Sequence, residues 1–305
     1  MTCAVFGFPE CAAPAARLAE ALGVPNREVT VRRFPDGESL VRVPMSAETA
    51  ILYRSLDDPN GKLVEVLLAA SALRDEGAAK IVLVVPYLAY MRQDAAFHAG
   101  EAISQRVIGS LLAQHCDALL TVDAHLHRIH DLRQIMPAIE AVNLSAAPVL
   151  SAALDGCDDP LLVGPDGESR QWVEAIAGPR GLDFLVGRKD RLGDREVRLV
   201  IDGIERAAGR RIVLVDDLVS SGETLQAAAR LLRDAGAGRI EAWVTHCLAT
   251  AGDLERIERA GISSLRATDS VPGPAASIHI AALLAGEIAR RGWLTGKGTA
   301  CPPKV

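Results

Sequence analysis

Apolar and polar residues are distributed along this chain in the pattern of a layered α/β protein. Short apolar runs rich in Val, Ile and Leu are typical of buried parallel strands, and they occur at residues 50–52, 81–85, 118–122, 161–163, 212–215 and 240–245. Segments with apolar residues at helical spacing lie between and after them, at residues 62–74, 103–114, 169–176, 226–234 and 279–290. Strands that alternate with helices predict parallel sheets flanked by helices.

The length of the chain predicts two domains. Its 305 residues exceed one typical core, since a single domain commonly holds about 150 residues. Residues 80–87 (KIVLVVPY) and 211–218 (RIVLVDDL) both join an apolar strand to a polar loop, which favours a duplicated unit. Small residues, Pro148 and an acidic cluster place the boundary within residues 142–159. We expect domains at residues 1–145 and 146–290 and a flexible tail at residues 291–305.

Composition and charge exclude several classes of partner. The formal net charge of −6, with Lys and Arg scattered along the chain, predicts no binding to nucleic acid or to anionic membranes. The six cysteines form no CxxC pair, which argues against a disulfide framework or a structural zinc and favours a cytoplasmic protein. We expect neither a secretion signal nor a transmembrane segment, because no apolar run approaches about 18 residues.

The segment at residues 211–225, RIVLVDDLVSSGETL, carries the strongest chemical signal. A helical pattern follows its apolar strand, so the loop between them lies at the carboxyl end of a strand and the amino end of a helix. Backbone N–H groups and the helix dipole attract phosphate there, and the candidate binding residues are Ser220, Ser221, Gly222 and Thr224. The preceding Asp216 and Asp217 fit the vicinal hydroxyls of a ribose or a bridging Mg²⁺. Local capping by Asp and Ser is the alternative.

Two loops in the first half carry further polar groups. Residues 34–38, FPDGE, join Phe34 to the carboxylates of Asp36 and Glu38, although a plain β-turn also explains the Pro-Asp-Gly. A buried strand precedes residues 86–94, PYLAYMRQD, and lifts polar side chains to the sheet edge where open α/β sheets bind ligands; these are Arg92, Gln93 and Asp94. A solvated loop is the alternative reading of this segment.

Three more candidate positions lie at or near strand ends. His125 comes off a strand end and is followed by two further histidines, but no cysteine or second acid has the spacing of a zinc site. Asp166 takes the equivalent position in the second half, as a metal ligand or as a helix N-cap. Lys189 and Arg191 lie in GRKDR, a charged stretch that is typical of solvated surface when taken alone.

Taken together and in order, the segments FPDGE, PYxxYxRQD, VDxH, PD, KxR and VDDxxxSGxT resemble ribose-phosphate diphosphokinase, also called phosphoribosyl-pyrophosphate synthetase. The resemblance extends from about residue 31 to residue 290. It implies two tandem type I phosphoribosyltransferase-like domains, each a parallel sheet flanked by helices. It also implies Mg²⁺-dependent transfer of the β,γ-diphosphoryl group of ATP to the C1 hydroxyl of ribose 5-phosphate, which leaves AMP.

The resemblance further implies roles for individual residues. Lys189 and Arg191 would come from a mobile loop that closes over the reacting phosphorus. His125 and Asp166 would hold Mg²⁺. Ribose 5-phosphate would bind to Asp216, Asp217, Ser220, Ser221, Gly222 and Thr224, and ATP to Phe34, Asp36, Glu38, Arg92, Gln93 and Asp94. Because the FPDGE loop of the family reaches across a subunit interface, a homodimer or higher homo-oligomer with a composite ATP site is implied.

The sequence departs from the family pattern after several of these motifs. Ala95 and Ala96 follow RQD, where the family carries basic residues. Glu168 and Ser169 follow the PD turn in place of small residues, and Glu223 replaces a common glycine in the phosphate loop. Residues 100–104, GEAIS, look more like the archaeal-type branch, so regulation by phosphate or ADP does not follow from the resemblance.

Two other functions are consistent with parts of the sequence. A salvage phosphoribosyltransferase needs only the loop at residues 215–224. A non-catalytic, nucleotide-binding regulatory paralogue would explain the departures at Ala95, Ala96, Glu168 and Glu223. Lys189 and Arg191 argue against the paralogue, because a binding protein has little use for cations that stabilise a transition state.

Overall fold

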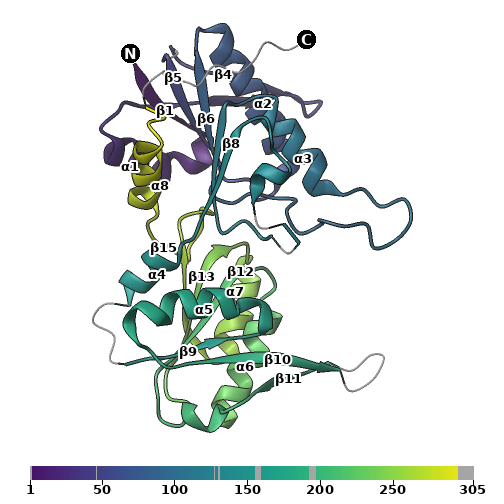
Figure 1. Cartoon of the computed structure of the whole chain (residues 1–305), viewed down its shortest axis with the longest axis vertical. Coiled ribbons are helices and arrows are strands. Elements are labelled where there is room, and N and C mark those ends of the chain that lie inside the picture. The colour runs from purple at the N-terminus through teal and green to yellow at the C-terminus, as the bar shows by residue number, and fades with distance from the viewer. Residues whose placement is uncertain are drawn as a thin grey trace. The chain divides into compact units, whose positions relative to one another are not determined.

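The computed structural model describes residues 2–45, 47–126, 128–129, 131–154, 159–191 and 197–294. The chain divides into two compact units, Met1–Leu144 with Ile280–Val305, and Ser145–His279. Each unit is built on a parallel sheet flanked by helices, so the predicted fold class is confirmed (Figure 1). No helix in these ranges is long and apolar enough to span a bilayer.

The first unit contains a six-stranded, wholly parallel sheet in the order β2-β1-β5-β6-β7-β8. The interior strand β5 is buried at every position, as expected for a parallel strand covered by helices on both faces. The elements are β1 Cys3–Gly7, β2 Asn26–Glu28, β5 Thr49–Tyr53, β6 Lys80–Val84, β7 Ala118–Val122, β8 Glu140–Leu144, α1 Ala12–Leu22, α2 Pro59–Asp75, α3 Ser104–Ala113 and α8 Ala281–Arg290.

The last helix belongs to the first unit, whereas the predicted boundary assigned residues 280–290 to the second. α8 packs against α1 (Figure 1), and both helices bury small residues such as Ala15 of α1 and Ala285 of α8. Beyond α8, the indole N–H of Trp293 donates to Glu140 on β8 at 3.0 Å. Helical spacing predicts a helix but does not say which sheet the helix covers. Residues 295–305 of the predicted tail lie outside the described ranges.

The second unit contains a seven-stranded sheet in the order β11-β10-β9-β12-β13-β14-β15. The pairing of β10 with β11 is antiparallel, and the other pairings are parallel. The elements are β9 Leu161–Gly164, β10 Phe184–Arg191, β11 Val197–Ile201, β12 Ile212–Val219, β13 Ile240–Cys247, β14 Ile262–Thr268, β15 Ala276–Ile278, α4 Ala147–Ala153, α5 Arg170–Ala177, α6 Glu223–Asp234 and α7 Ala251–Arg259.

A separate antiparallel hairpin in the first unit carries the FPDGE segment. Its strands are β3 (Thr30–Arg33) and β4 (Ser39–Arg42), which pair only with each other. The Phe34 N–H donates to the Glu38 carbonyl at 2.8 Å, and Gly37 takes a left-handed φ of 93° that favours glycine. FPDGE therefore forms the hairpin turn, and the turn that Pro-Asp-Gly predicts is confirmed.

The predicted apolar strands are all present, but two strands differ from the sequence analysis. β12 continues to Val219, so Asp216 and Asp217 lie within the strand and only a short loop precedes α6. The GRKDR stretch is not a loop, because Lys189 and Arg191 lie in β10. The charged residues of this stretch do not predict a strand from the sequence, yet the stretch belongs to β10, which pairs with β9 and β11.

Candidate active site

Polar side chains from three neighbouring strands meet at one edge of the second sheet. Leu185 of β10 and Leu214 of β12 are both register partners of Val163 on the intervening strand β9. The three residues therefore lie side by side across the sheet. Side chains along a strand repeat with a period of two, so Lys189 and Asp216 point to the same face of the sheet as these two leucines. Asp166 follows the carboxyl end of β9, between them.

Asp166 holds the ammonium group of Lys189. The Lys189 Nζ lies 2.7 Å from Oδ2 of Asp166, while Oδ1 accepts the Glu168 N–H at 3.1 Å and caps a short 3-10 turn. The hydrogen bond to Asp166 raises the pKa of Lys189 against the opposing effect of burial, and the charges of Asp166, Glu168 and Asp216 raise it further. Asp166 is thus an N-cap, as one alternative predicted, and also the partner of a cation.

Asp216 lies among other carboxylates. Burial raises the pKa of Asp216 well above its ordinary range, and the negative charges of Asp217 and Asp166 raise it further. Asp217 is only 4% exposed, and its N–H donates to Asp216 Oδ1 at 3.0 Å. Like charges gathered in this way are relieved by a cation or by hydroxyl donors. The carboxylate oxygens present fit Mg²⁺, which prefers oxygen ligands.

The loop between β12 and α6 exposes two serines and places a glycine at the start of the helix. Gly222 is the N-cap of α6 with a φ of 71°, and Ser220 and Ser221 are exposed. The first helical hydrogen bond runs from the Gln226 N–H to the Gly222 carbonyl at 2.9 Å, so earlier N–H groups have no partner in the helix. The predicted position of this loop, from strand end to helix start with Thr224 in the first turn, is confirmed; its ligand stays a prediction.

We expect Gly222→Ala to weaken the binding of ribose 5-phosphate, the ligand that the family resemblance implies for this loop. An added Cβ would lie 2.5 Å from Ile257 Cδ1, and the left-handed backbone disfavours any residue with a side chain. The loop must shift, and a loss of about 1.4 kcal/mol raises KM for ribose 5-phosphate tenfold. Steady-state kinetics measure this change. The matched control is Gly209→Ala, because Gly209 has a φ of 70° but open space around it; an equal rise in KM there would contradict the expectation.

The FPDGE turn presents its side chains at the tip of the hairpin. Phe34 is 36% exposed, and the Arg32 guanidinium lies 5.5 Å from its ring centre. Asp36 Oδ1 accepts the Glu38 N–H at 3.1 Å, which stiffens the turn. An aromatic face and two exposed carboxylates are thus available to a ligand or to a second chain.

The RQD segment directs one of its three side chains inward. The Asp94 side chain is 1% exposed, accepts the Arg128 backbone N–H at 3.0 Å and forms an ion pair with the Arg128 guanidinium. Burial opposes ionisation of Asp94, but these bonds and the charge of Arg128 hold its pKa below the usual range. Arg128 is itself exposed and lies 5.6 Å from the ring centre of Phe97. The sequence analysis did not single out Arg128. Of the other RQD residues, Arg92 is exposed.

The two predicted metal ligands lie in different units, His125 in the first and Asp166 in the second. His125 follows β7 through Asp123, whose φ of 37° turns the chain, and the Ala124 N–H donates to Asn143 at 2.9 Å. His127 and His130 lie outside the described residues, as does the Arg191 side chain. Among the described residues, no three His, Cys, Asp or Glu side chains group as a metal site.

Comparisons with known proteins agree with these features. The family model for the N-terminal domain of ribose phosphate pyrophosphokinase matches residues 3–115, and the phosphoribosyl transferase domain model matches residues 134–263. A ribose-phosphate pyrophosphokinase from Methanopyrus kandleri is 36% identical over 271 residues, which covers 87% of this chain and 91% of the relative. The chain belongs to the ribose-phosphate pyrophosphokinase family.

A second member of the ribose-phosphate pyrophosphokinase family, from Thermococcus kodakarensis, is 35% identical and covers 83% of this chain and 89% of its own length. The crystal structure of phosphoribosylpyrophosphate synthetase from Mycobacterium smegmatis superposes with a TM-score of 0.81 at 24% identity, and the match covers 96% of this chain and 99% of that one. This structural likeness shows the shared fold. The predicted family, with its archaeal-type features, is confirmed.

Proposed function

We propose that this chain transfers the β,γ-diphosphoryl group of ATP to the C1 hydroxyl of ribose 5-phosphate and releases phosphoribosyl pyrophosphate and AMP. The observation that carries the proposal is the cluster of Lys189, Asp166 and Asp216 beside the loop that precedes α6. A cation, paired carboxylates and a phosphate-binding loop are the parts that such a transfer needs, because it depends on positioning and charge more than on covalent catalysis.

In the proposed site, the second unit binds the sugar. Asp216 and Asp217 accept hydrogen bonds from the ribose hydroxyls, and the 5-phosphate is bound by the backbone and hydroxyl groups of Ser220, Ser221, Gly222 and Thr224. Lys189, with Arg191 further along β10, stabilises the negative charge that develops on the transferred phosphoryl group. The salt bridge to Asp166 holds the Lys189 ammonium in position for this role.

In the same proposal, the first unit binds ATP. Phe34, Asp36 and Glu38 at the hairpin tip bind adenine and ribose of a neighbouring subunit's nucleotide, which requires at least a homodimer. Arg92 and Gln93 bind within the ATP pocket. Asp94 acts by holding Arg128, since its own carboxylate is turned to that side chain.

Mg²⁺ is the proposed cofactor, and within the second unit Asp166 would hold it; His125, the other predicted ligand, lies in the first unit. When bound, it neutralises phosphate charge and orients the diphosphate oxygens. The carboxylates around Asp166 and Asp216 provide the oxygen ligands that it prefers.

AMP formation tests the proposal directly. Incubation of the chain with ribose 5-phosphate, ATP and Mg²⁺ should yield AMP and phosphoribosyl pyrophosphate in equal amounts, measured by chromatography. No AMP at any Mg²⁺ concentration would overturn it. Base-dependent release of pyrophosphate from added phosphoribosyl pyrophosphate, without a need for ATP, would instead identify the salvage phosphoribosyltransferase. Binding of ATP without turnover would identify the regulatory paralogue.

We expect Arg128→Ala to raise KM for ATP about tenfold, because loss of a charge-assisted contact commonly costs that much in affinity. Arg128 supplies a cation beside RQD, where Ala95 and Ala96 replace the basic residues of the family. Initial rates at varied ATP measure the change. Arg133→Ala is the control, since Arg133 is also exposed and paired with an aspartate but lies on the short 3-10 turn Leu132–Gln134. An unchanged KM in Arg128→Ala would remove Arg128 from the site.

A further inference from the structure

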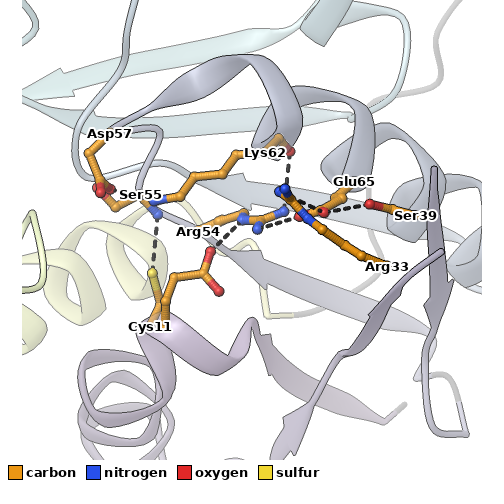
Figure 2. A network of polar contacts seen from close by, with 9 residues as sticks. Cys11, Arg33, Ser39, Arg54, Ser55, Asp57, Lys62 and Glu65 are labelled. Atoms are coloured by element: carbon orange, nitrogen blue, oxygen red, sulfur yellow. Dashed lines mark hydrogen bonds and ion pairs between the residues drawn. The ribbon is translucent and has the colours of Figure 1, made fainter. Parts of the chain in front are cut away.

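A buried glutamate lies at the base of the hairpin that carries FPDGE. Glu65 is on α2, and its side chain is 2% exposed. Its Oε1 accepts the Ser39 hydroxyl at 2.7 Å and lies 3.6 Å from Nη2 of Arg33, while its Oε2 accepts Nη2 of Arg54 at 2.6 Å. Figure 2 shows Arg33, Ser39 and Arg54 gathered around this carboxylate.

The two hairpin residues that reach Glu65 are those that flank the FPDGE turn. Arg33 directly precedes Phe34, Ser39 directly follows Glu38, and the two face each other in the register of β3 and β4. Glu65 therefore binds the last residue pair before the turn. A contact at this pair sets the direction in which the tip projects, because the turn adds only a few residues beyond it.

The hairpin depends on such contacts. β3 and β4 form a two-stranded sheet outside the six-stranded one, and an isolated two-stranded hairpin is marginally stable. Val31 and Val41 pack against the core on one side. On the α2 side, a cavity of about 380 Å³ is lined by Arg33, Gly37, Glu38 and Ser39 of the hairpin and by Gly61, Val64 and Leu68 of α2. On this side, the polar contacts of Glu65 connect the hairpin to α2.

Arg54 holds Glu65 in place from the core side. Its side chain is 4% exposed, and its guanidinium lies 3.8 Å from the ring centre of Phe8. Nε donates to Glu10 at 2.7 Å and Nη1 to the Lys62 carbonyl at 3.3 Å, so each guanidinium nitrogen has a partner (Figure 2). A guanidinium held in this way cannot follow Glu65 if the glutamate moves. The network therefore fixes the hairpin relative to the core of the first unit.

We propose that Glu65, supported by Arg54, is a positioning residue for nucleotide binding, which sets the projection of the FPDGE tip through Ser39 and Arg33. The proposal rests on the proposed function, because it assigns Phe34, Asp36 and Glu38 to ATP. It predicts that weakening the hairpin side of the network changes the affinity for ATP and leaves the sugar site unchanged. A purely structural role would change stability without this selectivity.

The test compares the two sides of the network. The double variant Arg33→Met with Ser39→Ala removes both hairpin contacts and leaves the Glu65 pair with Arg54 intact. We expect KM for ATP to rise about tenfold, while kcat and KM for ribose 5-phosphate stay within about twofold. The control Glu10→Gln weakens Arg54 on the core side and should leave all three constants within about twofold. An unchanged KM for ATP in the double variant, or an equal rise in Glu10→Gln, would overturn the proposal.

Hydrogen exchange provides a readout that does not require activity. Peptides covering residues 33–42 should exchange faster in the double variant than in the wild type, and Glu10→Gln should not accelerate them. Unchanged exchange in the double variant would overturn the anchoring role of Glu65. A wild-type protein that makes no AMP would overturn the proposed function alone, since the exchange measurement still reports the hairpin contact.

Discussion

Replacement of Lys189 by alanine should lower kcat for AMP formation by about 100- to 1000-fold, the usual cost of removing one group that stabilises transition-state charge. KM for ribose 5-phosphate should change far less, because in the proposed reaction the ammonium acts on charge that develops during transfer. Lys189 is suited to this role since β10 holds it 2.7 Å from Asp166 and on the same face of the sheet as Asp216. Initial rates at saturating substrates measure the effect.

A neighbour on the same strand separates this role from the general charge of β10. Arg188 points to the other face and its Nε lies 3.1 Å from Asp202. Arg188→Ala should therefore keep kcat within about twofold of the wild type. Equal losses in both variants would show that the overall positive charge of β10, and not Lys189 in particular, lowers the barrier. A full rate in Lys189→Ala would show that Lys189 is not a catalytic residue.

Replacement of Glu65 by alanine should destabilise the first unit by about 3–5 kcal/mol, because it removes the buried carboxylate partner of the Arg54 guanidinium and leaves it only the partly exposed carboxylate of Glu10. Arg54 is 4% exposed, so water cannot replace the lost partner. Urea unfolding followed by the fluorescence of Trp293, with Trp172 and Trp243 replaced by Phe, reports this unit. A loss below 1 kcal/mol would contradict the expectation.

The matched control for this prediction is the other carboxylate on Arg54. Glu10 is 34% exposed, and Glu10→Ala leaves Arg54 paired with Glu65, so we expect a loss of no more than about 1 kcal/mol. Equal losses at the two positions would mean that burial of Glu65 does not set the energy of the network.

The pH dependence of stability provides an independent check on Glu65. Burial opposes ionisation, but hydrogen bonds from Ser39 and Arg54 and the charges of Arg54 and Arg33 outweigh it and lower the pKa of Glu65. A lowered pKa contributes stability above the unfolded value near 4.3, and this is lost as pH falls through the folded value. The advantage of the wild type over Glu65→Gln should therefore shrink below about pH 4.

Local patterns in the sequence were sufficient for most elements and for the family. β5, β9 and the first half of β12 are short apolar runs, and burial on both faces of a parallel sheet requires that composition. The loop before α6 could be placed because strand end, glycine and helical spacing all lie within one segment. The order of the motifs identified the family without any knowledge of how they come together.

Tertiary contacts decided which side chains act together. Lys189 meets Asp166 across 23 positions because β10 pairs with β9, a pairing that the charged GRKDR stretch does not predict. The Asp94 side chain is buried against Arg128, 34 positions later. Sheet order and packing set these distances, and neither is encoded in the spacing of any one segment. For that reason the sequence names the groups of the site, while the fold determines their partners and their charge.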